Sequence, residues 1–281
     1  MSALVTGEYL VSQALALALA DFLAGESGLA KARVKDCLAK GGVWVSRPGR
    51  RFARCRKAKT PLGPGCRVRL YYDPEILRQI PPPPRLLADR KHYSLWDKPA
   101  GLLAQGTNFG DHCSLLRLAE TYFSPPRPVF LLHRLDREAS GLMLIAHSPR
   151  AAAGLSRLWQ SRAVLKQYRI TVLGLWNREE QGVIDLPLDG KEARTEYQLL
   201  AIERSRGFSR LLVTLGSGRL HQIRRHFALI GFPVIGDPRY GQGNKDMAGL
   251  QLRAERLAFT CPLTGAREDF RAPEPASKTG E

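Results

Sequence analysis

The sequence predicts an α+β protein, in which a large strand-rich domain follows a small and strongly basic α/β unit. Three observations support this prediction. Apolar residues make up 44% of the 281 residues and charged residues 25%, as in chains that bury a packed core. Four consecutive prolines at 81–84 form a stiff, extended spacer, which marks a domain boundary. Most segments after this boundary have the pattern of strands.

The N-terminal unit is expected over residues 10–74, followed by a proline-rich linker over 75–86. Apolar residues recur at helical spacing in two of its segments, and Gly41-Gly42 ends the second of them. Two short strands are predicted after this point, with a basic turn between them. In chain order, we expect helices over 12–23 and 29–40 and strands over 43–45 and 66–72.

The large domain is expected over residues 87–273, with a disordered tail over 274–281. Its last predicted helix begins directly after the glycine-rich segment Gly216-Ser217-Gly218. The predicted strands cover 92–96, 142–146, 167–173, 195–202, 210–215 and 256–260, and the predicted helices cover 114–121, 150–161 and 220–230.

The positive charge is concentrated in the N-terminal unit. The chain has a formal net charge of +17, and residues 31–70 hold thirteen Lys and Arg but one acid, Asp36. An effect on solubility alone would not concentrate the charge in this way, so this unit is expected to bind a polyanion such as RNA or DNA. An anionic membrane surface is the alternative. Lys31, Arg33 and Lys35, on one side of the predicted second helix, are the candidate phosphate contacts.

Cysteine usage and hydropathy indicate where the protein acts. The five cysteines contain no Cys-x-x-Cys pair, so neither a disulfide framework nor a zinc site is indicated and a reducing compartment is expected. No run of 18 apolar residues occurs, so no membrane-spanning helix is expected. We expect a cytoplasmic protein with no membrane partner, and a monomer.

Asp136 is the first candidate for chemistry, because of its surroundings. An apolar segment at 129–132 leads into the sequence HRLDR at 133–137, and a second apolar segment follows at 142–145. A carboxylate in a turn between two buried strands is costly to bury without a partner. Beside Arg134 and Arg137 it can remain ionised and act as a nucleophile or base. An ordinary Asp–Arg surface pair fits these residues equally well.

A second cluster lies at the start of the predicted helix at 220–230. His221, Arg224 and Arg225 are three and four residues apart and share a helix face. A helix N-terminus behind a glycine-rich turn also favours phosphate, although an exposed basic helix end is commonplace. His221 and His226 are five residues apart and do not face one another, so no metal site is expected. Tyr168, at the start of a predicted strand, is a weaker signal.

Four segments in this order resemble the RluA-type family of pseudouridine synthases. They are DKPAGL at 97–102, HRLDREASG at 133–141, KQY at 166–168 and GRLHQIRRHFALIGFPVIGDPRYG at 218–241. The end of the domain, ERLAFTCPLTGAREDFRAP at 255–273, is similar to the last strands of that family. The resemblance covers about 87–273 and implies a large mixed, mainly antiparallel sheet flanked by helices. The N-terminal unit resembles the small RNA-binding domain named after small-subunit ribosomal protein four.

The resemblance implies a role for several residues. Asp136 matches the aspartate that attacks the target uridine, and Arg134 matches the arginine that helps to displace the base. Tyr168 matches the tyrosine that stacks on the flipped uracil and is the proposed general base, and Arg224 matches the basic partner of the aspartate. Ala139 stands where the family more often has Thr. The remaining candidates for substrate binding are His133, Arg137, Arg219, His221 and Gln222, together with Lys31, Arg33 and Lys35.

The reaction implied is the isomerisation of uridine to pseudouridine in structured RNA, in which no atom is gained, so no cofactor or metal is expected. We expect 23S ribosomal RNA as the substrate, because members with this kind of N-terminal domain often act on it. The arginine pair in HQIRRH keeps transfer RNA open as an alternative. The alternative is a non-catalytic, ribosome-associated RNA-binding protein. In such a protein Asp136, Tyr168 and Arg224 would have no catalytic role. A hydrolase using His133 or His221 lacks a Gly-x-Ser-x-Gly motif.

Overall fold

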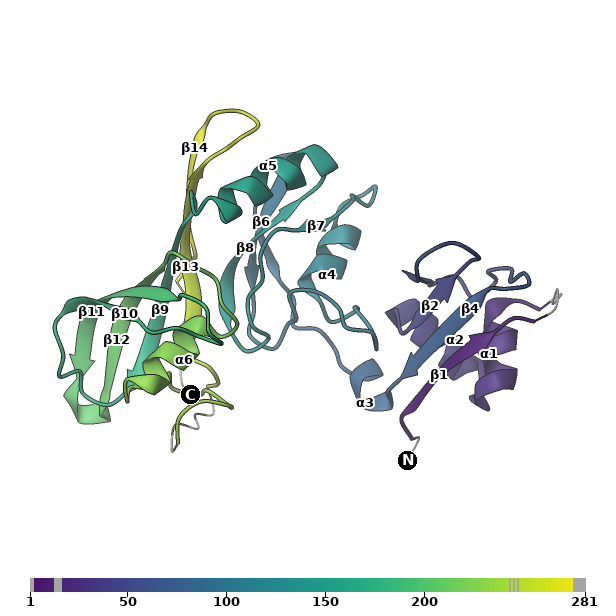
Figure 1. Ribbon diagram of the computed structural model, residues 1–281, viewed down its shortest axis with the longest axis horizontal. Coiled ribbons are helices and arrows are strands. Elements are labelled where there is room, and N and C mark those ends of the chain that lie inside the picture. The colour runs from purple at the N-terminus through teal and green to yellow at the C-terminus, as the bar shows by residue number, and fades with distance from the viewer. Residues whose placement is uncertain (1–2, 13–16, 243, 245, 247, 275–281) are drawn as a thin grey trace. The chain divides into compact units, whose positions relative to one another are not determined.

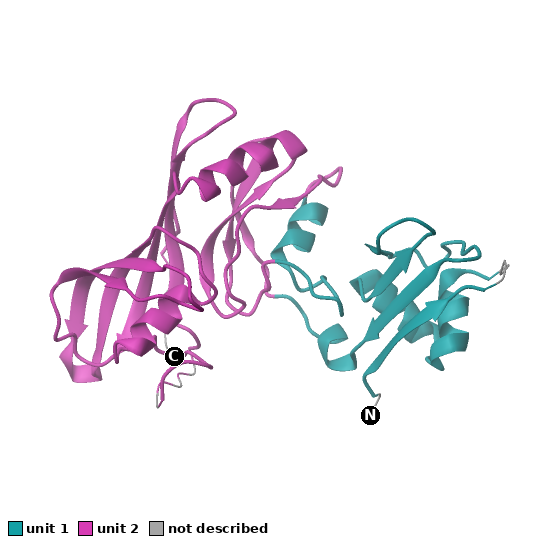
Figure 2. Cartoon of the chain, in the orientation of Figure 1, with its two compact units in different colours: residues 1–81, 105–122 teal, residues 82–104, 123–281 magenta. Residues whose placement is uncertain are grey.

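The computed structural model describes residues 3–12, 17–242, 244, 246 and 248–274. The chain forms two compact units, shown as a ribbon in Figure 1 and by colour in Figure 2. Residues 1–81 and 105–122 form the first unit, and residues 82–104 and 123–281 form the second. The sequence placed 105–122 inside the large domain, whereas these residues pack with the N-terminal unit. The expected disordered tail lies outside the described residues, apart from Glu274.

The first unit is built on a four-stranded sheet with the strand order β1-β4-β2-β3, in which neighbouring strands are antiparallel. Its core contains Leu19 and Leu23 from α1, Leu38 from α2 and Leu70 from β4. The strands are β1 (Val5–Leu10), β2 (Val43–Ser46), β3 (Ala53–Arg54) and β4 (Arg67–Tyr72), and the helices are α1 (Leu19–Ser27), α2 (Lys31–Lys40), α3 (Pro74–Leu77) and α4 (Leu115–Tyr122).

The start of the chain differs from the prediction. A helix was predicted over 12–23, but α1 begins at Leu19, and residues 13–16 lie outside the described part of the chain. The unit also begins earlier than residue 10, because β1 pairs with β4 along its whole length. Glu8 of β1 forms ion pairs with Arg67 and Arg69 of β4, which compensates its charge on this edge strand. The other predicted elements of this unit are confirmed within two residues.

The second unit is built on a ten-stranded sheet. The order of its main path is β10-β11-β12-β9-β13-β8-β6-β5, with β14 paired to β13 and β7 to β8. β8 and β13 are parallel, and the other pairs in the described chain are antiparallel, so the mixed and mainly antiparallel sheet is confirmed. Residues 85–89, at the end of the predicted linker, form its first strand.

The elements of this unit have the following bounds. The strands are β5 (Arg85–Asp89), β6 (Tyr93–Lys98), β7 (Phe130–Leu131), β8 (Ser140–Ala146), β9 (Leu165–Leu173), β10 (Gln181–Asp185), β11 (Arg194–Glu203), β12 (Phe208–Leu215), β13 (Leu252–Thr260) and β14 (Arg267–Arg271). The helices are α5 (Pro149–Gln160), α6 (Gln222–Leu229) and a short 3-10 helix at Arg204–Arg206. The predicted helices at 150–161 and 220–230 correspond to α5 and α6.

One row of residues crosses the centre of this sheet. Val213 of β12, Tyr168 of β9, Ala254 of β13 and Gly141 of β8 are partners in register. Gly141 has φ 110°, a conformation that side-chain-bearing residues rarely adopt, and a Cβ atom there would overlap the backbone of Ala254. The glycine therefore allows the parallel pairing of β8 and β13, directly after the turn that contains Asp136.

We predict that Gly141→Ala lowers the free energy of unfolding by about 2–4 kcal/mol, since it adds both backbone strain and steric overlap. Denaturant unfolding of the full chain measures this change. Gly216→Ala is the control, because Gly216 is exposed and no atom lies within 4 Å of its added Cβ atom. A loss below about 0.5 kcal/mol for Gly141→Ala, as expected for ordinary surface substitutions, would contradict this account of the β8–β13 pairing.

Candidate active site

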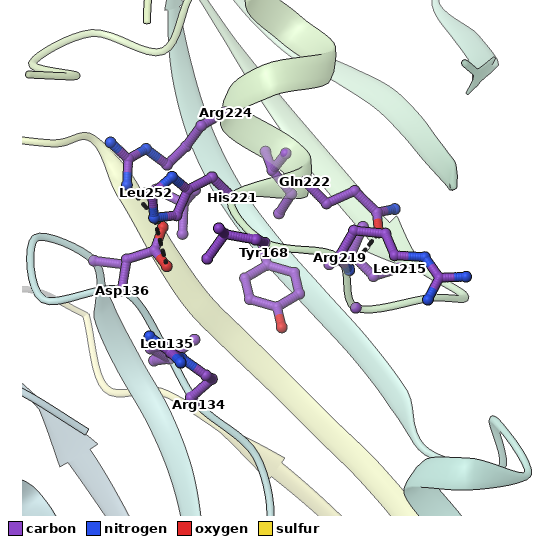
Figure 3. A pocket seen from close by; sticks show the side chains of 14 residues that line it. Arg134, Leu135, Asp136, Tyr168, Leu215, Arg219, His221, Gln222, Arg224 and Leu252 are labelled. Carbon is purple, nitrogen blue, oxygen red and sulfur yellow. Dashed lines mark hydrogen bonds and ion pairs between the residues drawn. The ribbon is translucent and has the colours of Figure 1, made fainter. Parts of the chain in front are cut away.

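A pocket of about 340 Å³ opens where the turn before β8, strand β9 and the start of α6 meet. Figure 3 shows Asp136 on one side of it, with Arg224 and His221 facing the carboxylate and the Tyr168 ring nearby. Its volume falls in the range of small-molecule sites. The lining residues are Arg134, Leu135, Asp136, Ala139, Tyr168, Leu215, Gly218, Arg219, Leu220, His221, Gln222, Ile223, Arg224 and Leu252.

The carboxylate of Asp136 is anchored on one side and open on the other. Arg224 donates a hydrogen bond from Nη1 to Asp136 Oδ2 at 2.8 Å. The second oxygen, Oδ1, lies 3.7 Å from Nε2 of His221. The Asp136 side chain retains 18% of its exposure, whereas Arg224 retains 1%. The carboxylate is therefore held by a buried cation and remains accessible from the pocket.

Asp237 holds the other side of the Arg224 guanidinium. Arg224 donates to it through Nε at 2.7 Å and through Nη2 at 2.8 Å. Burial disfavours the charge of Arg224, but the hydrogen bonds to Asp237 and Asp136 raise its pKa above the ordinary value. Burial opposes the charge of Asp237 as well, yet the Arg224 guanidinium and two backbone N–H groups lower its pKa. Arg224 and Asp237 are thus both charged at neutral pH in this arrangement.

Tyr168 supplies a flat aromatic surface in the pocket. Its side chain comes from the centre of the sheet, and the residue is 8% exposed. Burial, followed by the negative charge of Asp136, raises the pKa of Tyr168 to about 12, so its hydroxyl is protonated at neutral pH. Leu215 and Leu252 line the same pocket. A planar, uncharged ring is the kind of ligand that this surface suits.

The turn that carries Asp136 is fixed by backbone contacts. Lys98, at the end of β6, is fully buried and donates to the carbonyl oxygens of Leu102 at 2.8 Å and Arg137 at 3.3 Å. Gly101 N–H also donates to the Arg137 carbonyl at 2.7 Å. Burial lowers the pKa of Lys98 to about 8, against the opposing charges of Asp136 and its neighbours. The predicted DKPAGL segment therefore supports the neighbouring turn.

The family's more frequent Thr is absent at position 139, and the turn closes without a hydroxyl there. The backbone N–H of Ala139 donates to the carbonyl of Asp136 at 3.2 Å. Its methyl group is buried, with 1% of the residue exposed. The Asp136 carboxylate contacts Arg224 and His221.

Some of the residues predicted to bind substrate line the pocket. Arg134 is exposed at its edge, and Arg219 lies farther from Asp136 in the view of Figure 3. Gln222 also lines the pocket, but its side-chain amide is satisfied inside the protein. Its oxygen accepts from Ser217 Oγ and Arg219 N, and its nitrogen donates to Arg194 O and Thr195 Oγ1. Gln222 therefore shapes the pocket, and its contact with substrate stays a prediction.

His133 and Arg137 do not line the pocket. The His133 ring stacks on Trp159 with centroids 4.7 Å apart, and its Nε2 accepts the backbone N–H of Leu144 at 3.0 Å. Burial lowers the pKa of His133 to about 3, so the ring is neutral. Arg137 Nε donates to the carbonyl of Gly101 at 3.2 Å. Both predicted substrate contacts instead have partners within the fold.

Arg224 and Arg225 were predicted to share a helix face, but their side chains have different partners in the structure. Arg224 turns inward to Asp136, whereas Arg225 pairs with Asp189 through two hydrogen bonds of 2.8 and 2.9 Å. His221 keeps its place in the pocket and bonds Tyr240 Oη through Nδ1 at 2.9 Å. Asp237 and Tyr240 were not predicted, because their segment showed only the Gly and Pro content of a tight loop.

The three candidate phosphate contacts of the N-terminal unit lie on α2, in the first compact unit. Lys31 forms an ion pair with Asp21, and its side chain is still about half exposed. Arg33 and Lys35 are exposed. In the described part of the chain, no three His, Cys, Asp or Glu side chains are grouped to hold a metal ion. No helix in that part is long and apolar enough to span a membrane.

Comparison with known proteins relates this site to one family. The family model described as RNA pseudouridylate synthase matches residues 92–229. An uncharacterized RNA pseudouridine synthase of Chloroflexus aurantiacus is 31% identical over 286 residues, covering 91% of this chain and 85% of that protein. The ribosomal large subunit pseudouridine synthase D of Nitrosomonas europaea is 35% identical over 220 residues, covering 69% of this chain and 62% of that protein.

Solved structures share the fold. Human RNA pseudouridylate synthase domain containing 1 has a TM-score of 0.58 at 19% identity, covering 70% of this chain and 87% of that one. Human RNA pseudouridylate synthase domain containing 4 has a TM-score of 0.55 at 22% identity, covering 68% of this chain and 88% of that one. The chain belongs to the RNA pseudouridylate synthase family, a family of isomerases that act on RNA.

Proposed function

We propose that Asp136 is the catalytic residue of this pseudouridine synthase and that its substrate is a uridine of large-subunit ribosomal RNA. One observation supports the assignment of Asp136 as the catalytic residue. Among the described residues that line the pocket, Asp136 is the one carboxylate, and it is held by a buried arginine with its other face open. A nucleophile in such a position is oriented before the substrate arrives.

The proposed chemistry uses this carboxylate directly. Attack by Asp136, on the sugar or on the uracil ring, accompanies cleavage of the bond between the sugar and N1 of uracil. The freed base rotates, C5 bonds to the sugar, and the C5 proton is lost as N1 gains one. Arg224 stabilises the carboxylate whenever it is released as an anion. Both routes leave the atom count of the RNA unchanged.

Tyr168 is proposed to stack on the flipped uracil. Its ring lies in the pocket near apolar side chains, and base–aromatic stacking offsets part of the cost of unstacking the nucleotide. A pKa of about 12 leaves roughly one molecule in 10⁵ ionised at pH 7, so a standing phenolate base is disfavoured. The exposed guanidinium of Arg134, at the pocket edge, is positioned to fill the space that the base leaves.

The first compact unit is proposed to bind the RNA backbone, as the small domain that it resembles would. Its exposed cations support this, since α2 presents Arg33 and Lys35, and the turn after β2 presents Arg47, Arg50 and Arg51. Phosphate contacts of this kind provide affinity that does not depend on sequence. The choice of a particular uridine would then depend on contacts made by the pocket and the residues around it.

We predict that replacing Lys31, Arg33 and Lys35 together by Gln weakens RNA binding and reduces its salt dependence. Each lost phosphate contact lowers the slope of log K against log salt by about 0.7 for single strands. Because Lys31 is already paired with Asp21, we expect a reduction by fewer than three contacts. Filter binding at several salt concentrations measures the slope.

The matched control replaces Arg204, Arg206 and Arg210 by Gln. It also removes three charges, and Arg210 among them pairs with Glu203. An unchanged slope for the α2 variant, or equal losses for both variants, would contradict a dedicated role for α2.

Ribosomal RNA is proposed as substrate from the relatives. The proteins of Nitrosomonas europaea and Pseudomonas aeruginosa that match at 35% and 31% identity are both named ribosomal large subunit pseudouridine synthase D. We further propose that the protein acts as a monomer in the cytoplasm, where its five free cysteines remain reduced.

Mapping of pseudouridine in total RNA, from cells with and without the gene, tests the substrate. We predict that at least one pseudouridine disappears from 23S ribosomal RNA in the deletion strain and returns when the wild-type gene is restored. Loss of a site from transfer RNA alone would overturn the ribosomal assignment and leave the enzyme class intact.

A further inference from the structure

The turn at 236–241 lies behind the active site and makes no part of its lining. Its sequence, GDPRYG, has no chemical signature beyond a tight turn. In the structure, two of its side chains nevertheless reach the residues that hold Asp136. Asp237 contacts Arg224, and Tyr240 contacts His221.

Asp237 is bonded on every side. Its Oδ1 accepts from Arg224 Nη2 and from the backbone N–H groups of Arg239 and Tyr240, at 2.8, 2.8 and 3.1 Å. Its Oδ2 accepts from Arg224 Nε at 2.7 Å. The side chain has no exposed surface. Two guanidinium nitrogens are thereby fixed in the plane of one carboxylate, and this orientation directs Nη1 toward Asp136.

The backbone of the turn is fixed as well. Gly236 has φ 74°, and a Cβ atom there would overlap the backbone of Gly249. Asn244 Nδ2 donates to the carbonyl oxygens of Val234 and Tyr240, both at 2.9 Å. Asp237 therefore projects from a turn whose backbone is held by contacts within the fold.

Tyr240 provides a second contact to the same carboxylate. Its hydroxyl lies 2.9 Å from His221 Nδ1, and His221 Nε2 lies 3.7 Å from Asp136 Oδ1. The Arg224 guanidinium also lies over the Tyr240 ring, 5.3 Å from its centroid. His221 itself has φ 51°, so its ring orientation benefits from an external partner. Each oxygen of Asp136 thus faces a side chain that this turn orients.

We propose that the turn at 236–241 positions the Asp136 carboxylate, with Asp237 acting through Arg224 and Tyr240 acting through His221. This inference rests on the proposed role of Asp136. A long arginine side chain bonded to one carboxylate alone has several rotamers open to it, and small displacements of a reacting group cost large factors in rate. Asp237 and Tyr240 are positioning residues, since neither lines the pocket.

The test is a double-mutant cycle between positions 237 and 224, read as single-turnover conversion of ribosomal RNA from a strain that lacks the gene. Asp237→Asn keeps the shape and an oxygen acceptor but loses the charge and one acceptor for the guanidinium. We expect it to lower the rate at least tenfold while the Kd for RNA stays within twofold. In an Arg224→Gln background the same change should lower the rate less than twofold, because the two positions act as a unit.

Asp269→Asn is the matched control. Asp269 also holds an arginine through two bonds, Arg256 Nε at 2.8 Å and Nη2 at 2.6 Å, but at an exposed site on β13 and β14. We expect its rate within twofold of the wild type. Tyr240→Phe is an independent variant should Asp237→Asn fail to fold. It should lower the rate severalfold, and this effect should vanish in a His221→Gln background.

A rate for Asp237→Asn within twofold of the wild type would overturn the proposal, as would a full effect that persists beside Arg224→Gln. If Asp237→Asn does not fold, an unchanged rate for Tyr240→Phe overturns it instead. If the proposed function is wrong, the result differs from these outcomes, because the wild type itself would then form no pseudouridine in this RNA.

Discussion

The buried guanidinium of Arg224, shared between Asp136 and Asp237, is the interaction on which the active site depends. An arginine that is 1% exposed is tolerable only with its charge and donors satisfied, and the two carboxylates satisfy both. Asp237 is completely buried, whereas Asp136 keeps an open face. The same cation therefore holds a buried carboxylate on one side and the partly exposed carboxylate of Asp136, the proposed nucleophile, on the other. The result is a carboxylate held beside an aromatic ring and apolar side chains, an arrangement that suits a planar, uncharged base.

The fold brings this cluster together from distant parts of the chain. Tyr168 and the strand that follows Asp136 are linked through β13, in the row that includes Gly141. Lys98 closes the Asp136 turn from β6, and α6 delivers Arg224 after β12. The contributions come from strands of one sheet and from the turn and the helix that connect to them. Rigid placement of this kind reduces the motion that a reacting group must lose before the transition state.

Much of this arrangement could be predicted from the sequence, and the limits have physical causes. Strands with strong periodicity, such as β9 and β12, were found, because burial on a sheet imposes a pattern on their residues. Asp136 and Arg224 were candidates from their neighbours in the sequence, whereas Tyr168 was a weak signal until the family resemblance was added. β1 and the packing of 105–122 with the first unit were missed, since both depend on contacts between distant segments. Asp237 was missed for the same reason, and the stacking of His133 on Trp159 explains why a histidine inside a motif has a structural contact instead.

Single-turnover conversion of the substrate RNA by Asp136→Asn tests the central claim most directly. The amide keeps the size of the side chain and an oxygen for Arg224, but it removes the negative charge required of the nucleophile. We expect RNA to bind with a Kd within about threefold of the wild type and pseudouridine formation to fall by at least about 10⁴-fold, as for a lost nucleophile. Turnover by this variant within tenfold of the wild type would contradict the assignment of Asp136 and, with it, the purpose of the Arg224–Asp237 support.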